Sequence, residues 1–140
     1  MDSILKGCIT ELKCKLYFME IGYTVSTPEN PMRYDFILDT GKKLFRVQVK
    51  TAVFTKEKLT ITTNSTRFMN GRWEHMTYGP EEIDYFCTWA DGKCYLIPIS
   101  ECSGQQEKSL RFEPAKNGQI KRVSFAKDYL AEDVLERLKT

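Results

Sequence analysis

The first apolar pattern along the chain is helical and runs from about Ser3 to Ile21. Apolar side chains recur there at spacings of three and four, which predicts an amphipathic helix with one core-facing stripe. The stripe consists of Leu5, Cys8, Ile9, Leu12, Leu16 and Met19. Asp2 or Ser3 can cap the start of this helix, and Gly22 stands where a left-handed residue would end it.

Beyond this helix, apolar and polar residues mostly alternate with a period of two, which predicts short strands. In the first half we expect an extended stretch at 23–27 and strands at 34–38, 44–52 and 59–63, joined as an antiparallel meander. In the second half we expect strands at 84–89 and 93–98 around a tight turn at 90–92. A short helix from Pro80, a hairpin of 110–112 with 120–125 and a closing helix at 129–139 complete the prediction.

The length of 140 residues predicts a single domain over residues 1–140. No apolar run approaches a membrane span and the opening residues lack the features of an export signal, so we expect a cytoplasmic protein without a membrane partner. The five cysteines have no Cys-x-x-Cys spacing, which argues against a zinc site and a disulfide framework and fits a reducing cytosol. A single histidine, His75, excludes most histidine-based chemistry; we expect it in a partly exposed loop.

The net charge of +2 is unevenly distributed along the chain. Residues 1–72 contain twelve Lys or Arg and seven Asp or Glu, whereas residues 73–140 contain nine and twelve. The basic half could therefore face a polyanion. Charge alone favours the simpler interpretation, a solvated surface.

The stretch from Asp35 to Lys50 places polar side chains in a regular pattern across one hairpin. With Thr40-Gly41 as the two central turn residues, Asp35 lies opposite Arg46. Because side chains alternate between the two faces of a sheet, Arg46, Gln48 and Lys50 share the face of Asp35. Val47 and Val49 then point into the core.

This face carries the side chains that metal-assisted phosphodiester hydrolysis requires. Mg²⁺ prefers oxygen ligands, with one or two carboxylates. Asp35 is the natural first ligand, Gln48 and the backbone carbonyl of Val49 can add neutral oxygens, and Glu11 can reach over from the edge of the helix stripe. Lys50 can orient the attacking water or stabilise the phosphate in the transition state. The alternative, the wet face of an antiparallel sheet, is about equally compatible with the residues alone.

The spacing of Asp35 and Gln48-Val49-Lys50 resembles the PD-(D/E)XK nuclease motif. More narrowly, Lys6-Gly7, Glu11, Gly22-Tyr23-x-Val25, Pro28 and Lys50-Thr51 are similar to the small group I intron-encoded homing endonucleases of that superfamily, and the similarity extends over about residues 3–102. Two positions depart from the pattern: Gln48 replaces the acidic residue of the (D/E)XK element, and Tyr34 replaces the proline before the aspartate.

The resemblance implies an α/β fold of the restriction-endonuclease type, a mixed β-sheet flanked by helices with the site at one edge. It implies a Mg²⁺-dependent endonuclease, with Mn²⁺ as a substitute, that makes a double-strand break in a long pseudo-palindromic DNA site. A Holliday-junction resolvase, a restriction-type nuclease and a DNA-binding module without cleavage remain alternatives. The metal ligands would be Glu11, Asp35, Gln48 and Val49, and the catalytic residues Glu11, Asp35, Gln48 and Lys50.

Two kinds of partner are expected. Basic residues of the first half would contact phosphates of double-stranded DNA: Lys42, Lys43, Arg46, Lys56, Lys58, Arg67 and Arg72. A double-strand cut needs two sites, so we expect a homo-oligomer; the resemblance favours a tetramer over a dimer. Apolar side chains of the second half could form the subunit contact or the core: Phe68, Met69, Trp73, Met76, Tyr78, Phe86 and Trp89.

Overall fold

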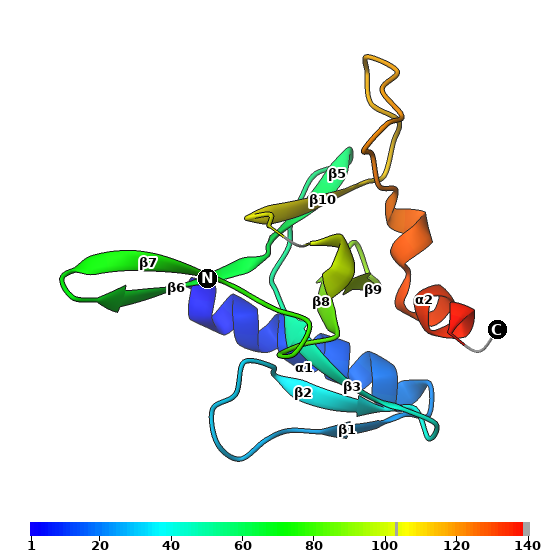
Figure 1. Ribbon diagram of the computed structural model, residues 1–140. Helices are drawn as coiled ribbons and strands as arrows, with labels where there is room; N and C mark the ends of the chain where they lie inside the picture. The colour runs from blue at the N-terminus through cyan, green and yellow to red at the C-terminus, as the bar shows by residue number, and fades with distance from the viewer. Residues whose placement is uncertain (103, 139–140) are drawn as a thin grey trace.

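The computed structural model describes residues 1–102 and 104–138, and a mixed five-stranded sheet forms its centre (Figure 1). The strand order is β1-β2-β3-β8-β9; β3 and β8 run parallel and the other neighbours run antiparallel. The strands are β1 Thr24–Ser26, β2 Phe36–Asp39, β3 Leu44–Val49, β8 Tyr85–Ala90 and β9 Lys93–Pro98. The expected mixed α/β architecture is thus confirmed, but β3, which carries Gln48, is the central strand and not an edge.

The central sheet is covered on both faces. The helices α1 (Ser3–Glu20) and α2 (Ala131–Arg137) share one apolar core with one face of the sheet. A second core lies on the opposite face, beneath a smaller sheet of order β10-β5-β4. Its strands are β4 Val53–Phe54, β5 Lys58–Thr62 and β10 Glu107–Arg111, and the short 3-10 helices are η1 Ile99–Glu101 and η2 Ala126–Tyr129.

Two further strands, β6 (Asn64–Met69) and β7 (Arg72–Thr77), form a separate ribbon that projects from the body (Figure 1). The turn between them is Asn70-Gly71, with φ of +54° and +78°. Both residues adopt positive φ, as the favoured two-residue hairpin turn requires. The sequence prediction missed this ribbon, and His75 lies on its second strand, exposed, and not in a loop.

Three expectations for the second half are wrong. Residues 80–83 form turns and no helix. Residues 112–125 form no hairpin: β10 pairs with β5, and Arg111 meets Phe125 through one isolated parallel bridge. The closing helix is divided into η2 and α2, because Leu130 between them is extended (φ −56°, ψ 129°); its expected end at residue 139 lies outside the described residues. The β8–β9 hairpin and its turn are confirmed.

Helix α1 has the expected length and caps, but it buries a different face. Asp2 accepts a hydrogen bond from the Leu5 N–H at 2.8 Å, and Gly22 ends the helix with φ +97°. The buried residues are Thr10, Cys14 and Phe18. The predicted core stripe lies mostly in solvent: Leu5, Cys8, Leu12, Leu16 and Met19 are exposed, and Ile9 is half-buried. Among the described residues no helix is both long and apolar enough to cross a bilayer.

Candidate active site

The β2–β3 turn sets the register of the site and differs from the predicted turn by one residue. It is centred on Gly41-Lys42, with the Thr40 N–H donating to the Lys43 carbonyl at 3.1 Å and Gly41 at φ +86°. When the turn moves by one residue along the chain, each residue of β3 faces a residue of β2 two positions away from the predicted partner. Arg46 consequently lies opposite Ile37, and the predicted pairing of Arg46 with Asp35 is wrong.

A shift of two residues leaves every side chain on its predicted face, since faces alternate with a period of two. Val47 and Val49 are buried in the core, whereas Arg46, Gln48 and Lys50 are only half-buried. Asp35 precedes β2, and its N–H donates to the Val47 carbonyl at 2.8 Å. The hairpin thus brings Asp35 beside Gln48, as the alternation predicted.

Four of the predicted site residues meet in one cleft. Glu11, Asp35, Gln48 and Val49 line an open hollow of about 450 Å³ between α1 and the β2–β3 hairpin. The remaining lining residues are small or apolar: Ile4, Gly7, Cys8, Leu12 and Thr51. A Cβ at Gly7 would meet Thr51 Oγ1 at 4.0 Å, which is an ordinary van der Waals contact, so the space at this position would accept a small side chain.

Asp35 is half-buried and fixed by the strand beside it. Its Oδ2 accepts the Val49 N–H at 2.7 Å. Burial raises the pKa of Asp35 to about 6; the Val49 hydrogen bond opposes this rise, Glu11 adds to it, and Lys15 and Lys50 oppose it. The pKa of Asp35 therefore marks a carboxylate whose negative charge is incompletely compensated in the metal-free protein, as expected for a cation ligand.

Gln48 is oriented by its amide nitrogen. In the orientation that satisfies its neighbours, this nitrogen donates to Asp35 Oδ2 at 3.2 Å and to the Arg33 carbonyl at 2.8 Å. The amide oxygen is then available to a cation. A glutamate at this position would have no donor for either acceptor, so a glutamine suits this particular surrounding.

Glu11 is paired with a lysine that the sequence interpretation did not include. Lys15 Nζ lies 2.8 Å from Glu11 Oε2 and also donates to Thr27 Oγ1 at 3.0 Å. The spacing of four residues along a helix was the available signal. Lys15 holds the Glu11 carboxylate near the cleft and contributes positive charge close to Asp35.

Lys50 is near the cleft but does not line it. Its ammonium donates to the Asn64 carbonyl at 2.9 Å and lies 5.2 Å from the ring centroid of Tyr78. Burial lowers the pKa of Lys50, the charge of Asp35 opposes this, and Arg33 reinforces it. Lys50 thus interacts electrostatically with Asp35. Its hydrogen bond to Asn64 also ties it to the base of the β6–β7 ribbon.

The donor set of the cleft fits a hard divalent cation. Two carboxylates, one side-chain amide oxygen and one backbone carbonyl are the oxygen types that Mg²⁺ accepts. The Val47 carbonyl points toward β2, and Val49, two residues further along the same strand, presents its carbonyl to the same side. No thiolate or imidazole is needed for this set.

The profile of the PD-(D/E)XK endonucleases matches residues 1–132. The chain belongs to this family. A bacterial homing endonuclease, I-Ssp6803I, has a similar solved structure, with a TM-score of 0.77, 19% sequence identity and coverage of 99% of this chain and 95% of that chain. At this identity the likeness establishes the fold. No curated protein matches the sequence.

Within this PD-(D/E)XK fold the seven predicted DNA-contact residues are dispersed. Arg46 is half-buried and bonded to neighbouring groups of the chain: its guanidinium donates to the carbonyls of Pro80 and Glu81 and lies 3.6 Å from Asp84. Lys56 and Lys58 are exposed at the β4–β5 turn, and Arg67 and Arg72 are exposed on the ribbon, each 3.7 Å from Glu74.

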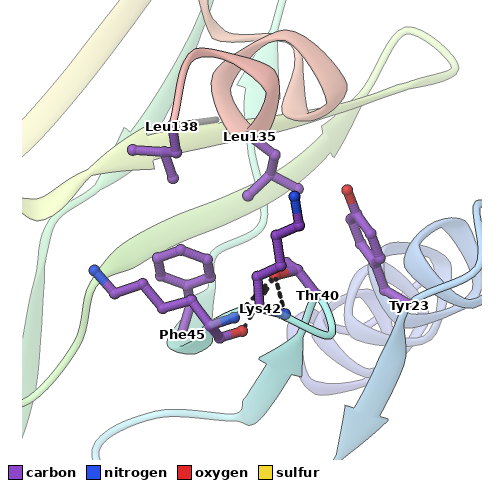
Figure 2. Close-up of a pocket in the computed structure, with 7 residues that line it drawn as sticks. Tyr23, Thr40, Lys42, Phe45, Leu135 and Leu138 are labelled. Carbon is purple, nitrogen blue, oxygen red and sulfur yellow. Dashed lines mark hydrogen bonds between the residues drawn. The ribbon is translucent and has the colours of Figure 1, made fainter. Parts of the chain in front are cut away.

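Lys42 and Lys43 lie at the opposite end of β3 from Gln48. Figure 2 shows the hollow in which they lie, between the β2–β3 turn and α2. Its other lining residues are Tyr23, Thr40, Phe45, Leu135 and Leu138, none of them acidic. This hollow shares no lining residue with the PD-(D/E)XK cleft, so Lys42 and Lys43 lie away from that cleft.

Arg33 is a further residue that the sequence interpretation missed. Its guanidinium donates to Glu82 Oε2 at 2.9 Å, to Ser65 Oγ at 2.8 Å and to the Thr77 carbonyl at 2.8 Å. It also stacks 4.0 Å over the Tyr78 ring, while its own carbonyl accepts the Gln48 amide. Arg33 thus connects both strands of the ribbon to the PD-(D/E)XK cleft; its sequence context carries no signal of this role.

Proposed function

We propose that the protein is a Mg²⁺-dependent DNA endonuclease, with Mn²⁺ as a substitute, that cuts both strands of a long target site in the manner of a homing enzyme. The observation that supports this best is the convergence of Glu11, Asp35, Gln48 and Val49 in one open cleft. Membership of the PD-(D/E)XK endonucleases supports the nuclease activity, and the fold it shares with a homing endonuclease supports the finer assignment.

Asp35 and Glu11 would hold the cation with their carboxylates, and Gln48 and Val49 with their carbonyl oxygens. When bound, Mg²⁺ supplies Lewis-acid stabilisation of phosphoryl oxygens and lowers the pKa of water. The protein contributes rigid positions. The Val49 N–H and the Gln48 amide fix Asp35, and Lys15 fixes Glu11.

Lys50 supplies the positive charge for the reacting phosphate. Its ammonium is half-buried and close to Asp35, where it can orient the attacking water or stabilise charge on the phosphate in the transition state. Asn64 and Tyr78 position this ammonium from the base of the ribbon.

The ribbon is the element best suited to grip the duplex. A two-stranded antiparallel ribbon fits the major groove of B-form DNA. Arg67 and Arg72 are exposed on one of its faces, and Phe68 and Trp73 form an exposed aromatic pair on the other. Since Arg33 and Lys50 both contact the base of the ribbon, DNA held there would lie next to the cleft.

A double-strand cut requires a second copy of the cleft with opposite polarity, which a two-fold oligomer supplies. The exposed face of α1 is a suitable surface for a second copy of this chain. Ile4, Leu12, Leu16 and Met19 are each at least half exposed there, and Ile4 and Leu12 also line the cleft. We propose a tetramer first and a dimer next.

A cleavage assay with and without Mg²⁺ tests this function. The substrates are supercoiled plasmid, cruciform DNA and a library of intron-insertion sequences. We expect Mg²⁺-dependent double-strand cuts in library members, and Asp35→Ala or Lys50→Ala should lower the rate on the order of 10³-fold or more. Glu11→Gln should also slow cleavage severely. Asp91→Asn, in the exposed β8–β9 turn, is the matched control and should cleave normally.

Each other outcome has a definite meaning. Selective cleavage of cruciform DNA would replace the homing assignment with a junction resolvase. Binding without cleavage under any metal would leave a DNA-binding module. Cleavage by Asp35→Ala at the parent rate would refute the assignment of the site itself.

A further inference from the structure

Three cysteines that are far apart in the sequence meet in the core. Cys14 belongs to α1, Cys87 to β8 and Cys94 to β9. Their sulfur atoms all lie within 4.8 Å of one another, and Cys87 Sγ is 3.5 Å from Cys94 Sγ. Their exposed fractions are 0%, 0% and 3%. The nuclease chemistry proposed above uses none of these thiols.

The separation of the sulfurs suits one metal ion. A metal–thiolate bond is about 2.3 Å long, so an ion in the plane of three sulfurs holds them about 4 Å apart. The three thiols already lie close to that arrangement and come from three different elements. Cys8 is exposed and Cys102 belongs to the second core, so neither joins the group.

The composition of the group indicates the kind of ion. Among the described residues no histidine, aspartate or glutamate joins the three sulfurs as a fourth ligand. Structural zinc requires four ligands, and Mg²⁺ and Ca²⁺ require oxygen. Soft all-sulfur surroundings select Cu(I), which is satisfied by three thiolates. We propose that Cys14, Cys87 and Cys94 form a three-coordinate site for a soft, thiophilic ion of the Cu(I) type.

A surface hollow borders one of the three cysteines. Cys94 lines a hollow of about 260 Å³ that opens to solvent beside Tyr17 and Trp89. Glu132 and Asp133 of α2 also line it, opposed by Lys93. Two carboxylates at the mouth favour the approach of a cation. When the ion binds, each thiol that becomes a thiolate releases one proton to solvent.

The site would connect to the catalytic cleft through the backbone. Cys14 follows Glu11 by three residues on α1, about one helical turn. The Cys87 carbonyl accepts the Lys50 N–H at 2.9 Å. An ion that joins α1 to β8 and β9 would therefore fix the position of Glu11 relative to Lys50. It would also stabilise the fold, because it binds the folded chain more tightly than the unfolded one.

The test uses the full-length protein, reduced and free of oxygen. Cu(I) is supplied as a complex with a competing chelator, native mass spectrometry gives the stoichiometry, and copper-edge X-ray absorption gives the ligands. We expect one Cu(I) per chain, three sulfur neighbours and a melting temperature raised by several degrees. Cys94→Ala and Cys14→Ala should each weaken binding roughly 100-fold or more, whereas Cys102→Ala and Cys8→Ala should bind as the parent does.

The proposal fails if the bound copper has fewer than three sulfur neighbours. It also fails if Cys8→Ala weakens binding as much as Cys94→Ala does, since the ion would then bind at the surface. If the core variants do not fold, the stoichiometry and sulfur count of the unaltered protein decide alone. No retention of Cu(I) against the chelator would leave three buried thiols that serve as small apolar side chains.

Discussion

The surroundings of Asp35 lower the stability of the metal-free protein. Its carboxylate is half-buried beside Glu11, and one backbone N–H and one side-chain amide donate to its Oδ2. Burial of an incompletely paired carboxylate costs free energy in the metal-free protein. Sites that bind a cation commonly carry such a cost in free energy when the cation is absent. In this protein the cost should be measurable as a pH dependence of stability.

The raised pKa of Asp35, about 6, predicts a pH-dependent cost to the metal-free fold. The folded-state pKa lies above the unfolded one, so stability is highest below about pH 4 for this group and falls as the pH rises through 6. Asp35→Asn should therefore stabilise the metal-free protein at pH 7 by on the order of 1 kcal/mol, allowing for partial solvent screening. Urea unfolding from pH 4 to 8 measures this.

The difference between Asp35→Asn and the parent should shrink as the pH falls from 7 to 4, because at pH 4 the carboxyl is almost fully protonated in the folded state and about half protonated in the unfolded state. Asp91→Asn removes a carboxyl from an exposed turn and serves as the control. A difference that is constant across the pH range would mean that the ionisation of Asp35 does not cause it.

Gln48→Glu would restore the acidic residue of the PD-(D/E)XK pattern, and we expect opposite effects with and without metal. The new carboxylate would face Asp35 Oδ2 and the Arg33 carbonyl, which now accept hydrogen bonds from the amide. Loss of both bonds and like-charge repulsion should destabilise the metal-free protein by about 1–3 kcal/mol. The additional carboxylate should bind Mn²⁺ more tightly, as calorimetric titration would measure.

Melting of the Gln48→Glu variant with and without Mn²⁺ separates these two effects. The variant should melt below the parent without metal and recover most of that loss with it. Gln119→Glu, a change of the same type in the exposed 112–125 segment, should leave both measurements unchanged. Equal Mn²⁺ affinity in parent and Gln48→Glu would remove Gln48 from the proposed ligands.

At the scale of elements, the sequence predicted which side chains share a face of the β2–β3 hairpin better than it predicted which face of α1 is buried. The shared face of Asp35, Gln48 and Lys50 follows from alternation, and it tolerates a wrong turn because the resulting error was two residues. α1 has apolar residues on more than one face. Periodicity cannot identify which face packs when smaller residues such as Thr10 and Cys14 permit a closer approach to the sheet.

The β6–β7 ribbon could have been found. Asn70-Gly71 is a strong short-range hairpin signal, which Asp91-Gly92 and Asn117-Gly118 share, and six residues on either side of Asn70-Gly71 pair in register. The ribbon was obscured because its strands pack little apolar surface against the body. Most of their residues are exposed, so neither strand has the buried, alternating pattern that marks a half-buried sheet.

If the ribbon grips DNA, its two arginines should contribute to the salt dependence of binding. Each phosphate contact adds about 0.9 to the slope of log affinity against log salt. Arg67→Gln combined with Arg72→Gln should therefore lower this slope by about 1.8 and weaken binding similarly for all sequences. Fluorescence anisotropy at several salt concentrations measures it. Lys127→Gln, exposed on η2, is the control; a slope unchanged by the ribbon variant would exclude both arginines from phosphate contact.

For the whole molecule, the mixed sheet explains why only part of the topology was predictable. The local hairpins β2–β3 and β8–β9 were correctly anticipated, since sequence-adjacent strands pair through short turns. The parallel contact of β3 with β8 spans about 38 residues, from Val47 to Tyr85, and no local pattern specifies it. This contact pairs Cys87 with Val49. It therefore holds the end of β3 that carries Gln48 and Val49 against β8.

The exposure of the apolar side chains shows which of them belong to the core and which are available for a subunit contact. Among the second-half residues considered for a subunit contact, Tyr78 and Phe86 are buried, and Met76 and Trp89 are half-buried; Phe68, Met69 and Trp73 are exposed. The larger contiguous candidate is the exposed stripe of α1, which the sequence assigned to the core. Exposed apolar residues in a continuous row indicate an interaction surface.

Leu16→Glu tests this surface. Leu16 is 53% exposed on α1 and does not line the cleft that contains Glu11 and Asp35. Glutamate has nearly the same helix propensity as leucine, so the fold should persist. Placing a charge in the centre of a two-fold contact introduces it twice, and we expect light scattering at micromolar concentration to show dissociation at this contact, from tetramer to dimer or from dimer to monomer. A monomeric variant should nick DNA or cut the two strands sequentially, because each subunit has one cleft.

Ile120→Glu makes a comparable change at an exposed residue away from α1 and should leave the oligomer intact. Three results would contradict the prediction. If the parent is a monomer that stays monomeric on DNA, concerted double-strand cutting has no structural basis. If Ile120→Glu dissociates the oligomer and Leu16→Glu does not, the contact lies on the 112–125 side of the molecule. If Leu16→Glu is monomeric but still cuts both strands in one encounter, the second cleft is not needed for the break.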